Sequence, residues 1–292
     1  MNFLHSIPAL IKYKVSIAVT FTAITGYIVY TGRFDFQIIN LVLGVFFLAS
    51  GSSALNECQE SEYDAKMPRT MNRPIPTGKL SLNEAIIIST LFCLLGLSIL
   101  FFSFGSITAL LGVINLVWYN LIYTYLKRVS SFAVVPGSLV GAIPAFMGWT
   151  AGGGYVFEPT IVFIAFYLFI WQIPHFWLLM LKYGKEYEDA GFKTINQAVN
   201  TGNLKLVIFA WVIATSFSSI IVPLFLVNIS LVFFLLIFAL NLGFIAIFTK
   251  LSFGNVAELN FRKSFVSINL YMMIFMIMLI VFHLATNSTL PY

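Results

Sequence analysis

Nine long apolar stretches constrain the fold of this chain more than any other feature. Each has about the 20 residues that a helix needs to cross the roughly 30 Å of hydrocarbon in a bilayer. They cover about 10–31, 36–56, 81–103, 105–126, 131–151, 158–181, 204–227, 229–250 and 264–286. Continuous apolar runs favour helices, because the strands of a membrane barrel would show short alternating segments. The sequence therefore predicts an all-α integral membrane protein with about nine transmembrane helices.

The charged residues are scarce and one-sided. Only 9% of the 292 residues are charged, whereas a soluble domain carries roughly 25% to cover its surface. With nine spans, fifteen of the sixteen Lys and Arg share the side of the N-terminus, and only Arg33 falls in the opposite loops. Because Lys and Arg accumulate in cytoplasmic loops, we expect a cytoplasmic N-terminus. The net charge of +5 follows from this topology and does not indicate nucleic-acid binding.

No linker or low-complexity segment divides the chain, so residues 1–292 are expected to form a single membrane-embedded domain. Lys12 and Lys14 interrupt the first apolar run, and no small-residue cleavage site stands out. We therefore expect no cleavable signal peptide.

Two long polar loops, at 57–80 and 182–203, lie on the predicted cytoplasmic side. They carry seven of the eleven acids, namely Glu57, Glu60, Glu62, Asp64, Glu186, Glu188 and Asp189. Topology alone requires only bases on this side. The gathering of acids beside bases therefore indicates a functional site.

The first loop places oxygen donors at helical spacing. If the second span continues as a helix, Asn56, Glu60 and Asp64 recur at i, i+4 and i+8. Each step of four turns the direction by only about 40°, so the three side chains share one face. Such a column at a membrane interface suits Mg²⁺, which prefers a few carboxylates together with the oxygens of a phosphorylated substrate.

The bases that follow suit the anion of such a substrate. Lys66, Arg69 and Arg73 come directly after the column, and Arg can bind phosphate oxygens in pairs. The alternative is that these are ordinary solvated loop charges. We keep that alternative for Glu57 and Glu62, which point away from the shared face.

The second loop, KYGKEYEDAGF, repeats the theme with Lys182, Tyr183, Glu186 and Tyr187. Its spacing is less regular, so it leaves open whether a second Mg²⁺ site forms. The glycines at its third and tenth positions, Gly184 and Gly191, predict a break in the helix.

Polar residues also occur within two spans. WYNLIYTYLKR places Tyr123 and Tyr125 near the cytoplasmic end of the fourth span, and WQIPHFW places Gln172 and His175 in the sixth. Polar groups inside a span are costly and often functional. Interfacial tyrosines also form aromatic belts, and a lone histidine is often a packing residue. Both alternatives stay open on these residues alone.

Several motifs together resemble a known family. NECQESEYDAKMPRTMNRPIPTG, YTYLKR, PGSLVGAIPAFMGW, WQIPHFW and KEYEDAG are similar to the heme O synthases, or protoheme IX farnesyltransferases, a branch of the UbiA superfamily of membrane prenyltransferases. The resemblance runs from about residue 10 to 285. The Asn-x₃-acid-x₃-Asp column is typical of the whole superfamily, and the RTxNRP, WQxPHFW and EY-x₂-AG motifs point to the heme branch.

The resemblance implies a UbiA-type bundle of nine helices around a central cavity that opens toward lipid. It implies that farnesyl diphosphate ionises with the help of Mg²⁺, that the 2-vinyl group of heme b attacks the allylic cation, and that water completes the new side chain of heme O. It also implies a multi-pass protein of the bacterial inner membrane. Heme A synthase or terminal oxidase assembly would then be its protein partners.

Carried over by position, the resemblance assigns roles to residues of this chain. Asn56, Glu60 and Asp64 would hold the diphosphate through Mg²⁺, and Arg69 and Arg73 would neutralise it as it leaves. Further substrate contacts are expected at Lys66, Tyr123, Lys127, Arg128, His175, Lys182, Tyr183, Glu186 and Tyr187. Among these, His175 is the expected contact to heme.

Two departures from the superfamily pattern matter. Glu60 stands where many members have Asp, which changes the reach of the side chain without removing a metal ligand. The second loop lacks a DxxxD motif, which argues against a quinone-type acceptor.

Two other functions are alternatives for a chain of this kind. One is a UbiA-type prenyltransferase with a different acceptor, against which WQIPHFW and EYEDAG argue. The other is a membrane transporter, for which charged or broken-helix sites near the middle of the bilayer would be expected. The acids here lie at one interface, as suits chemistry on an amphipathic substrate that enters from lipid.

Overall fold

The computed structural model describes residues 3–226, 229–253 and 260–287. Within these ranges the chain contains helices and no strands. Nine helical spans are long and apolar enough to cross a membrane: Tyr13–Thr31, Gln37–Asp64, Leu82–Phe104, Ser106–Val129, Val134–Ala151, Pro159–Asp189, Gly202–Phe225, Leu231–Phe253 and Phe261–Thr286. The prediction of nine spans is confirmed for the described part of the chain. The predicted last residue of the seventh span, 227, lies outside it.

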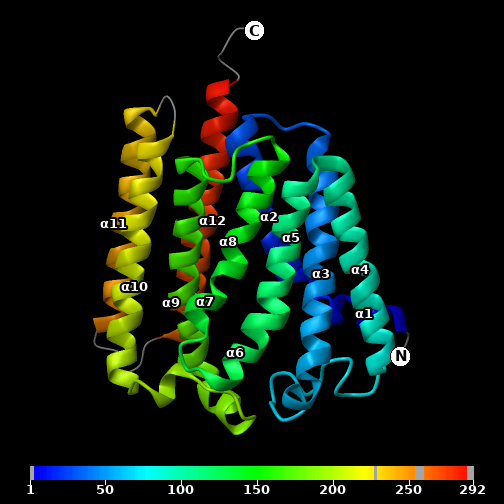
Figure 1. The fold of residues 1–292 in the computed structure, drawn as a ribbon. Coiled ribbons are helices and arrows are strands. Elements are labelled where there is room, and N and C mark those ends of the chain that lie inside the picture. The colour runs from blue at the N-terminus through cyan, green and yellow to red at the C-terminus, as the bar shows by residue number, and fades with distance from the viewer. Residues whose placement is uncertain (1–2, 227–228, 254–259, 288–292) are drawn as a thin grey trace.

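Figure 1 shows these spans as one upright bundle. Its helices are α1 (Phe3–Leu10), α2 (Tyr13–Thr31), α3 (Gln37–Asp64), α4 (Leu82–Phe104), α5 (Ser106–Val117), η1 (Trp118–Tyr123), α6 (Thr124–Val129), α7 (Val134–Gly137), α8 (Leu139–Ala151), α9 (Pro159–Asp189), η2 (Ile195–Gln197), α10 (Thr201–Ile221), η3 (Val222–Phe225), α11 (Leu231–Phe253) and α12 (Phe261–Asn287).

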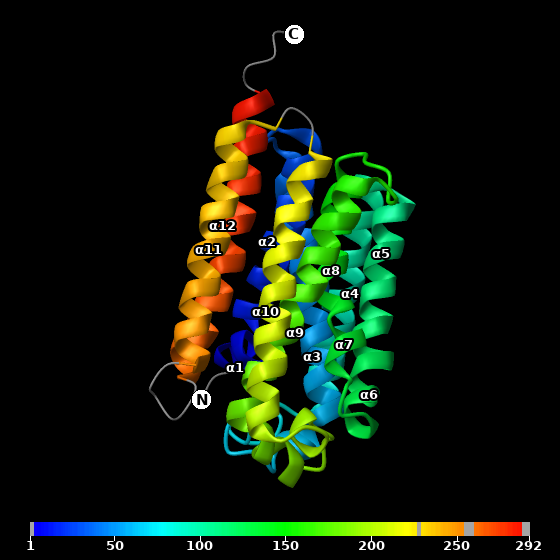
Figure 2. The ribbon, with the colours of Figure 1, turned by 90° about the vertical axis from the view of Figure 1, so that its left-hand side faces the viewer.

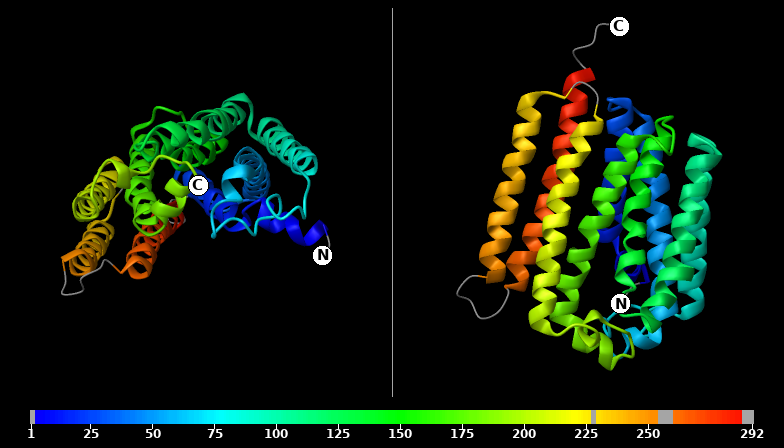
Figure 3. Two further views of the ribbon diagram at one scale, coloured as in Figure 1. Left: turned by 90° about the horizontal axis from the view of Figure 1, so that it is seen from below. Right: turned by 60° about the vertical axis from the view of Figure 1, so that its left-hand side comes forward.

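The spans are arranged as a ring. Each span packs against the next one along the chain, and α12 packs against both α2 and α9. The view from below in Figure 3 shows the helices following a curve, and the side view in Figure 2 shows the same spans upright. The long connections at 65–81 and 190–200 lie together at the lower end in Figure 1, which we call the polar end.

Two helices continue past their apolar spans at the polar end. α3 continues to Asp64, so the column from Asn56 to Asp64 is helical, as expected. α9 continues to Asp189, and the predicted break at Gly184 is therefore wrong. A Cβ atom on Gly184 would lie 2.2 Å from Asn196 Nδ2, so this glycine serves the close approach of the next loop. Gly191, with φ of +101°, follows the end of the helix.

The fourth span changes its winding near the polar end. Between α5 and α6 it forms the π-helix η1. π-helical turns are rare and frequently occur at functional sites. Here the turn presents Tyr119, Asn120 and Tyr123, and Asn120 donates from Nδ2 to the Ser52 carbonyl at 3.0 Å. The π-helix is thereby joined to α3 one turn above Asn56.

Candidate active site

The predicted column on α3 is buried. Asn56, Glu60 and Asp64 retain 2%, 5% and 1% of their accessible surface, so the alternative of solvated loop charges does not hold for them. The same alternative is wrong for Glu57, which is fully buried, because α3 continues as a packed helix past Asn56. Glu62, which points to the other side, is exposed as expected.

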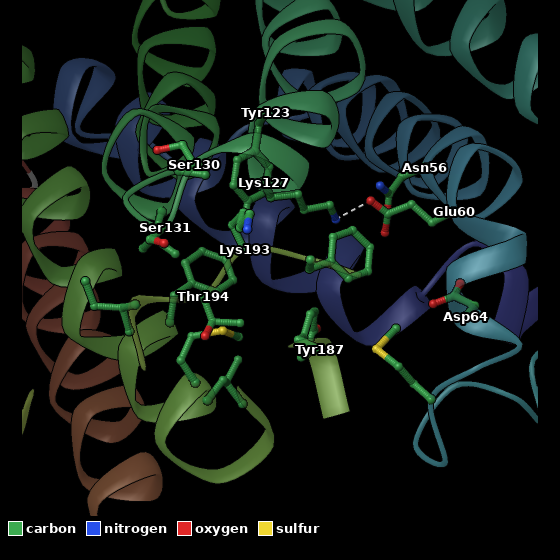
Figure 4. Close-up of a pocket in the computed structure, with 18 of the residues that line it drawn as sticks. Asn56, Glu60, Asp64, Tyr123, Lys127, Ser130, Ser131, Tyr187, Lys193 and Thr194 are labelled. Carbon is green, nitrogen blue, oxygen red and sulfur yellow. Dashed lines mark ion pairs between the residues drawn. The ribbon is translucent and has the colours of Figure 1, made fainter. Parts of the chain in front are cut away.

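Each acid of the column faces a base from another segment. Lys127 of α6 forms an ion pair with Glu60 (Figure 4). Arg73, in the connection after α3, donates from Nη1 to Asp64 Oδ2 at 2.6 Å. A buried carboxylate is costly unless it is paired and hydrogen-bonded. The sequence places acids and bases at separate positions, and the fold brings them together as pairs.

Asn56 is held by three groups. Its Oδ1 accepts hydrogen bonds from Lys12 Nζ at 2.8 Å and from the Tyr119 hydroxyl at 3.0 Å. Its Nδ2 donates to Thr124 Oγ1 at 3.0 Å. Because both acceptor positions of Oδ1 are used, the predicted binding of a metal by Asn56 would require one of these donors to move.

Lys12 reaches the site from an unusual backbone position. It caps the start of α2 with φ of 46° and ψ of 51°, and it is the only described residue other than glycine with a positive φ. Left-handed backbone is uncommon for such residues and often marks a functional constraint. Removal from bulk water, and then the nearby charge of Arg73, lower the pKa of Lys12 to about 8.

These groups line a cavity of about 210 Å³ at the polar end (Figure 4). Arg69 enters it from the 65–81 connection and donates a hydrogen bond to the Tyr187 hydroxyl of α9. Its guanidinium also lies over the rings of Tyr183 and Tyr187, 5.3 and 5.2 Å from their centroids. The cavity therefore joins the two polar loops that the sequence singled out.

The structure brings eight predicted residues together around this cavity and leaves six outside. Those lining it are Asn56, Glu60, Asp64, Arg69, Arg73, Tyr123, Lys127 and Tyr187. Those not lining it are Lys66, Arg128, His175, Lys182, Tyr183 and Glu186. The roles of all fourteen stay predictions, and geometry supports the first set.

Residues of the second set make structural contacts outside the cavity, among them Arg128, Lys182 and His175. Arg128 donates from Nη2 to the Gln59 carbonyl at 2.8 Å and lies over the rings of Tyr63 and Tyr125. Lys182 lies over the Phe261 ring, 4.7 Å from its centroid. His175 stacks between Trp171 and Phe265, with centroid distances of 5.0 and 4.8 Å.

Several residues of the cavity wall are not predicted from the sequence. These are Lys12, Met67, Tyr119, Ser130, Ser131, Lys193 and Thr194, among others. From the sequence alone, Lys12 is expected to contribute to the topology and to interrupt the first apolar run, and no role in a site is expected for it. Tyr119 could have been predicted from the sequence, because it lies one helical turn before Tyr123 in the same WYNLIY segment and so shares its helix face.

A second cavity of about 130 Å³ adjoins the first, further from the polar end. Tyr119 and Phe176 line both cavities. The rest of its wall is mainly apolar, with Val19, Leu48 and Met147 among its residues. The two cavities together give a charged compartment followed by an apolar one.

The residues of the first cavity fit a bound Mg²⁺. No group of three or more His, Cys, Asp or Glu side chains that could hold a metal occurs in the described ranges, so a closed protein cage is not built there. Mg²⁺ is instead bound through one or two carboxylates plus substrate phosphates. Glu60 and Asp64 would supply the carboxylates, and the bases that now pair with them would serve the phosphates.

Known proteins resemble this chain along most of its length. The model of the UbiA prenyltransferase family matches residues 18–269. The chain belongs to the UbiA prenyltransferase family. Its multi-pass membrane architecture is that of this family, and a charged cavity beside an apolar one suits a substrate with a diphosphate head and a prenyl tail.

Two relatives and one solved structure illustrate the place of the chain within the UbiA family. A protoheme IX farnesyltransferase of Geobacter sulfurreducens is 36% identical over 62% of this chain and 67% of that protein. One from Legionella pneumophila is 32% identical over 94% of this chain and 93% of that protein. The structure of a UbiA homolog from Archaeoglobus fulgidus bound to GPP and Mg²⁺ has a TM-score of 0.71 at 15% identity, and covers 96% of this chain and 99% of that chain. At this identity the likeness shows the UbiA-type fold.

Proposed function

We propose that this protein transfers the farnesyl group of farnesyl diphosphate to the 2-vinyl group of protoheme IX, with addition of water, and so forms heme O. The observation that carries this proposal is the match to the Legionella protoheme IX farnesyltransferase over nearly the full length of both chains. A UbiA-type enzyme with another acceptor, or a transporter, is not favoured by this match.

The first cavity would bind the diphosphate. Breaking the allylic C–O bond moves an electron pair onto the diphosphate, and cations fixed in a site sheltered from water stabilise that charge most. Arg69, Arg73 and Lys127 would supply these cations, with Lys12 as a fourth. Their present partners, Glu60, Asp64 and Tyr187 among them, keep them oriented toward the cavity.

Glu60 and Asp64 would bind Mg²⁺ in the loaded enzyme, with Asn56 as the third predicted ligand. When bound, this ion neutralises the diphosphate and makes it a better leaving group. Tyr119 and Tyr123, whose rings stack 6.1 Å apart beside the cavity, could face the allylic cation with their π-electrons.

The setting and partners of the enzyme complete the proposal. The relatives are bacterial, which supports the bacterial inner membrane as its location. Heme b would enter from the lipid side, with His175 as its proposed contact. Heme A synthase or terminal oxidase assembly would take up the product.

Mass spectrometry of extracted heme tests the proposal. Membranes that contain the protein are incubated with heme b, farnesyl diphosphate and Mg²⁺. We expect a heme heavier by one farnesyl group plus one water, and we expect it to disappear after chelation of the metal. Unchanged heme, together with diphosphate release when aromatic acceptors are supplied, would overturn the acceptor and keep the prenyltransferase. Intact farnesyl diphosphate in folded protein would overturn both.

A further inference from the structure

The first cavity carries more positive charge than the proposed diphosphate site accounts for. Five bases and two acids line it, namely Lys12, Arg69, Arg73, Lys127 and Lys193 with Glu60 and Asp64. Five against two leaves three positive charges on the wall. A diphosphate ester carries roughly three negative charges near neutral pH, and it would arrive with the doubly charged Mg²⁺. About two positive charges would then lack a counterion, which predicts a second anionic group in the loaded cavity.

Lys193 is the base of this cavity that has no protein partner. Lys127 and Arg73 form ion pairs. Lys12 and Arg69 donate side-chain hydrogen bonds. In the described part of the chain no acid lies within ion-pair distance of the Lys193 ammonium, and this group donates no hydrogen bond. It therefore remains for a further ligand.

Lys193 projects from a segment that is fixed to the bundle. Its backbone N–H donates to the Lys127 carbonyl at 3.1 Å, which joins the 190–200 connection to α6. Its neighbours Phe192 and Thr194 are buried, whereas Lys193 is exposed. The backbone is thus held in place while the ammonium stays accessible at the cavity wall, as a binding group requires.

Lys193 lies apart from the predicted magnesium ligands. Figure 4 shows Lys193 toward the side of Ser131 and Thr194, across the pocket from Glu60 and Asp64. A ligand of Lys193 would therefore bind beside the diphosphate and would not replace it.

An apolar strip of α9 adjoins Lys193. Asn196 Nδ2 donates to the Met180 carbonyl at 3.0 Å, so the segment that carries Lys193 packs on this part of α9. Phe176, Leu179 and Met180 line the first cavity, and Phe176 also lines the second. The ligand of Lys193 thus meets a charged group at the polar end and an apolar surface that leads away from it.

The two substrates of the proposed function differ in the anions that they offer. Farnesyl diphosphate has no anionic group besides its diphosphate. Heme b has two propionate carboxylates at one edge of a flat apolar macrocycle, and its vinyl groups lie at the opposite edge. The carboxylates match the unbalanced charge of the cavity, and the macrocycle matches the apolar strip of α9.

We infer that Lys193 binds a propionate carboxylate of heme b. This inference rests on the proposed function and names the group of the acceptor that the first cavity recognises. Lys193 donates a charge-assisted hydrogen bond to the carboxylate and forms no covalent bond. With the carboxylate edge at the polar end, the vinyl edge points along α9 toward Phe176, where the two cavities meet. The contact therefore positions the 2-vinyl group beside the prenyl donor.

Heme binding measured without farnesyl diphosphate tests the inference. Purified protein in detergent is titrated with heme b and, separately, with its dimethyl ester, in which both carboxylates are blocked. The heme absorption band gives Kd. We expect Lys193→Gln to raise Kd for heme b about tenfold, because one charge-assisted hydrogen bond is lost. The same substitution should leave Kd for the dimethyl ester unchanged, since the ester has no carboxylate for Lys193 to bind.

Two matched variants separate this contact from general effects of charge and folding. Lys193→Arg keeps the charge and should keep Kd for heme b within about threefold of the wild type. Lys185→Gln removes an exposed base near the end of α9 that lines neither cavity, and it should leave Kd unchanged. All variants at Lys193 retain the backbone N–H that binds the Lys127 carbonyl.

Turnover separates heme from diphosphate. In the presence of Mg²⁺, Lys193→Gln should raise KM for heme b about tenfold and leave KM for farnesyl diphosphate unchanged. A raised KM for farnesyl diphosphate with an unchanged Kd for heme b would assign Lys193 to the diphosphate and overturn the inference. An equal loss of heme affinity in Lys185→Gln would also overturn it, as would an equal loss of ester binding in Lys193→Gln.

The outcomes distinguish the two levels of the proposal. If the wild type binds heme b through Lys193 and makes no farnesylated heme, the proposed reaction is wrong and the carboxylate contact stands. If the wild type makes heme O and Lys193→Gln changes neither Kd nor KM for heme b, the proposed function stands and the inference is wrong.

Discussion

Two buried polar clusters lie inside this bundle. One is stabilised mainly by charged partners, and the other by hydrogen bonds among neutral side chains. The charged cluster consists of Asn56, Glu60 and Asp64 with their partners Lys12, Lys127 and Arg73, and it lines a cavity. The neutral cluster consists of Ser219 of α10, Asn241 of α11 and Tyr271 of α12. None of these three residues lines the two cavities described above.

The neutral cluster satisfies its own hydrogen bonds. The Tyr271 hydroxyl lies 2.7 Å from Ser219 Oγ and 2.8 Å from Asn241 Oδ1, and Asn241 Nδ2 donates to Ser219 Oγ at 2.9 Å. It joins three helices and has nothing left to offer a ligand. The charged cluster is instead paired through long, flexible cations that can exchange a carboxylate for a phosphate. The comparison teaches that burial alone does not mark an active site; exchangeable charge beside a cavity does.

The largest expected difference between the two clusters is the loss of activity on substitution of Asp64. The Asp64→Asn substitution keeps the size of the side chain and removes the charge that would bind Mg²⁺ and now orients Arg73. We expect kcat to fall about 100- to 1,000-fold, as when one electrostatic group of an active site is removed. Release of diphosphate from farnesyl diphosphate measures it. Glu62→Gln, which removes an exposed acid two positions earlier, is the matched control, and an equal loss there would refute the assignment.

Neighbouring bases provide the next test. Lys127 faces Glu60 in the cavity, whereas Arg128 holds the Gln59 carbonyl and two tyrosine rings outside it. We expect Lys127→Gln to lower kcat/KM for farnesyl diphosphate roughly 10- to 100-fold, the loss of one charge-assisted interaction. Arg128→Gln should leave kcat/KM nearly unchanged and lower the free energy of unfolding by about 1 kcal/mol. The reverse pattern would move the diphosphate site to Arg128.

A smaller effect is expected at Lys12. Lys12→Gln removes the ammonium that reaches Asn56, and we expect KM for farnesyl diphosphate to rise about tenfold. Lys14→Gln is its control, because Lys14 flanks the same span and is exposed. Both substitutions change the topological charge bias equally, so a difference between them reports the site. Equal KM values in the two variants would remove Lys12 from it.

The sequence predicted the parts of this structure that the bilayer and the helix period dictate. In a bilayer, a continuous apolar run must satisfy its backbone hydrogen bonds internally and therefore spans as a helix. The nine spans could for this reason be predicted from hydropathy. The column from Asn56 to Asp64 follows from spacing within one helix. Both predictions depend on residues close together in the chain.

The remainder of the site depends on contacts between distant segments. Lys12 meets Asn56 across 44 residues, and Tyr119 meets it across 63. Lys127 and Arg128 are adjacent, yet successive residues on a helix point about 100° apart, so only one enters the cavity. Which of the two does so is set by how α6 packs on α3, and the motif contains no information about that packing.

The smallest expected effect belongs to the neutral cluster. Tyr271→Phe removes a hydroxyl with two hydrogen bonds between helices, and we expect the free energy of unfolding in a membrane or micelle to fall by about 1 kcal/mol with kcat and KM unchanged. Tyr167→Phe is the matched control, because the Tyr167 hydroxyl is buried without a hydrogen-bond partner in the described part of the chain. Removing an unpaired buried hydroxyl should be neutral or stabilising. If Tyr271→Phe instead lowered kcat while stability held, the neutral cluster would be coupled to the chemistry, and the contrast between a structural and a catalytic cluster would fail.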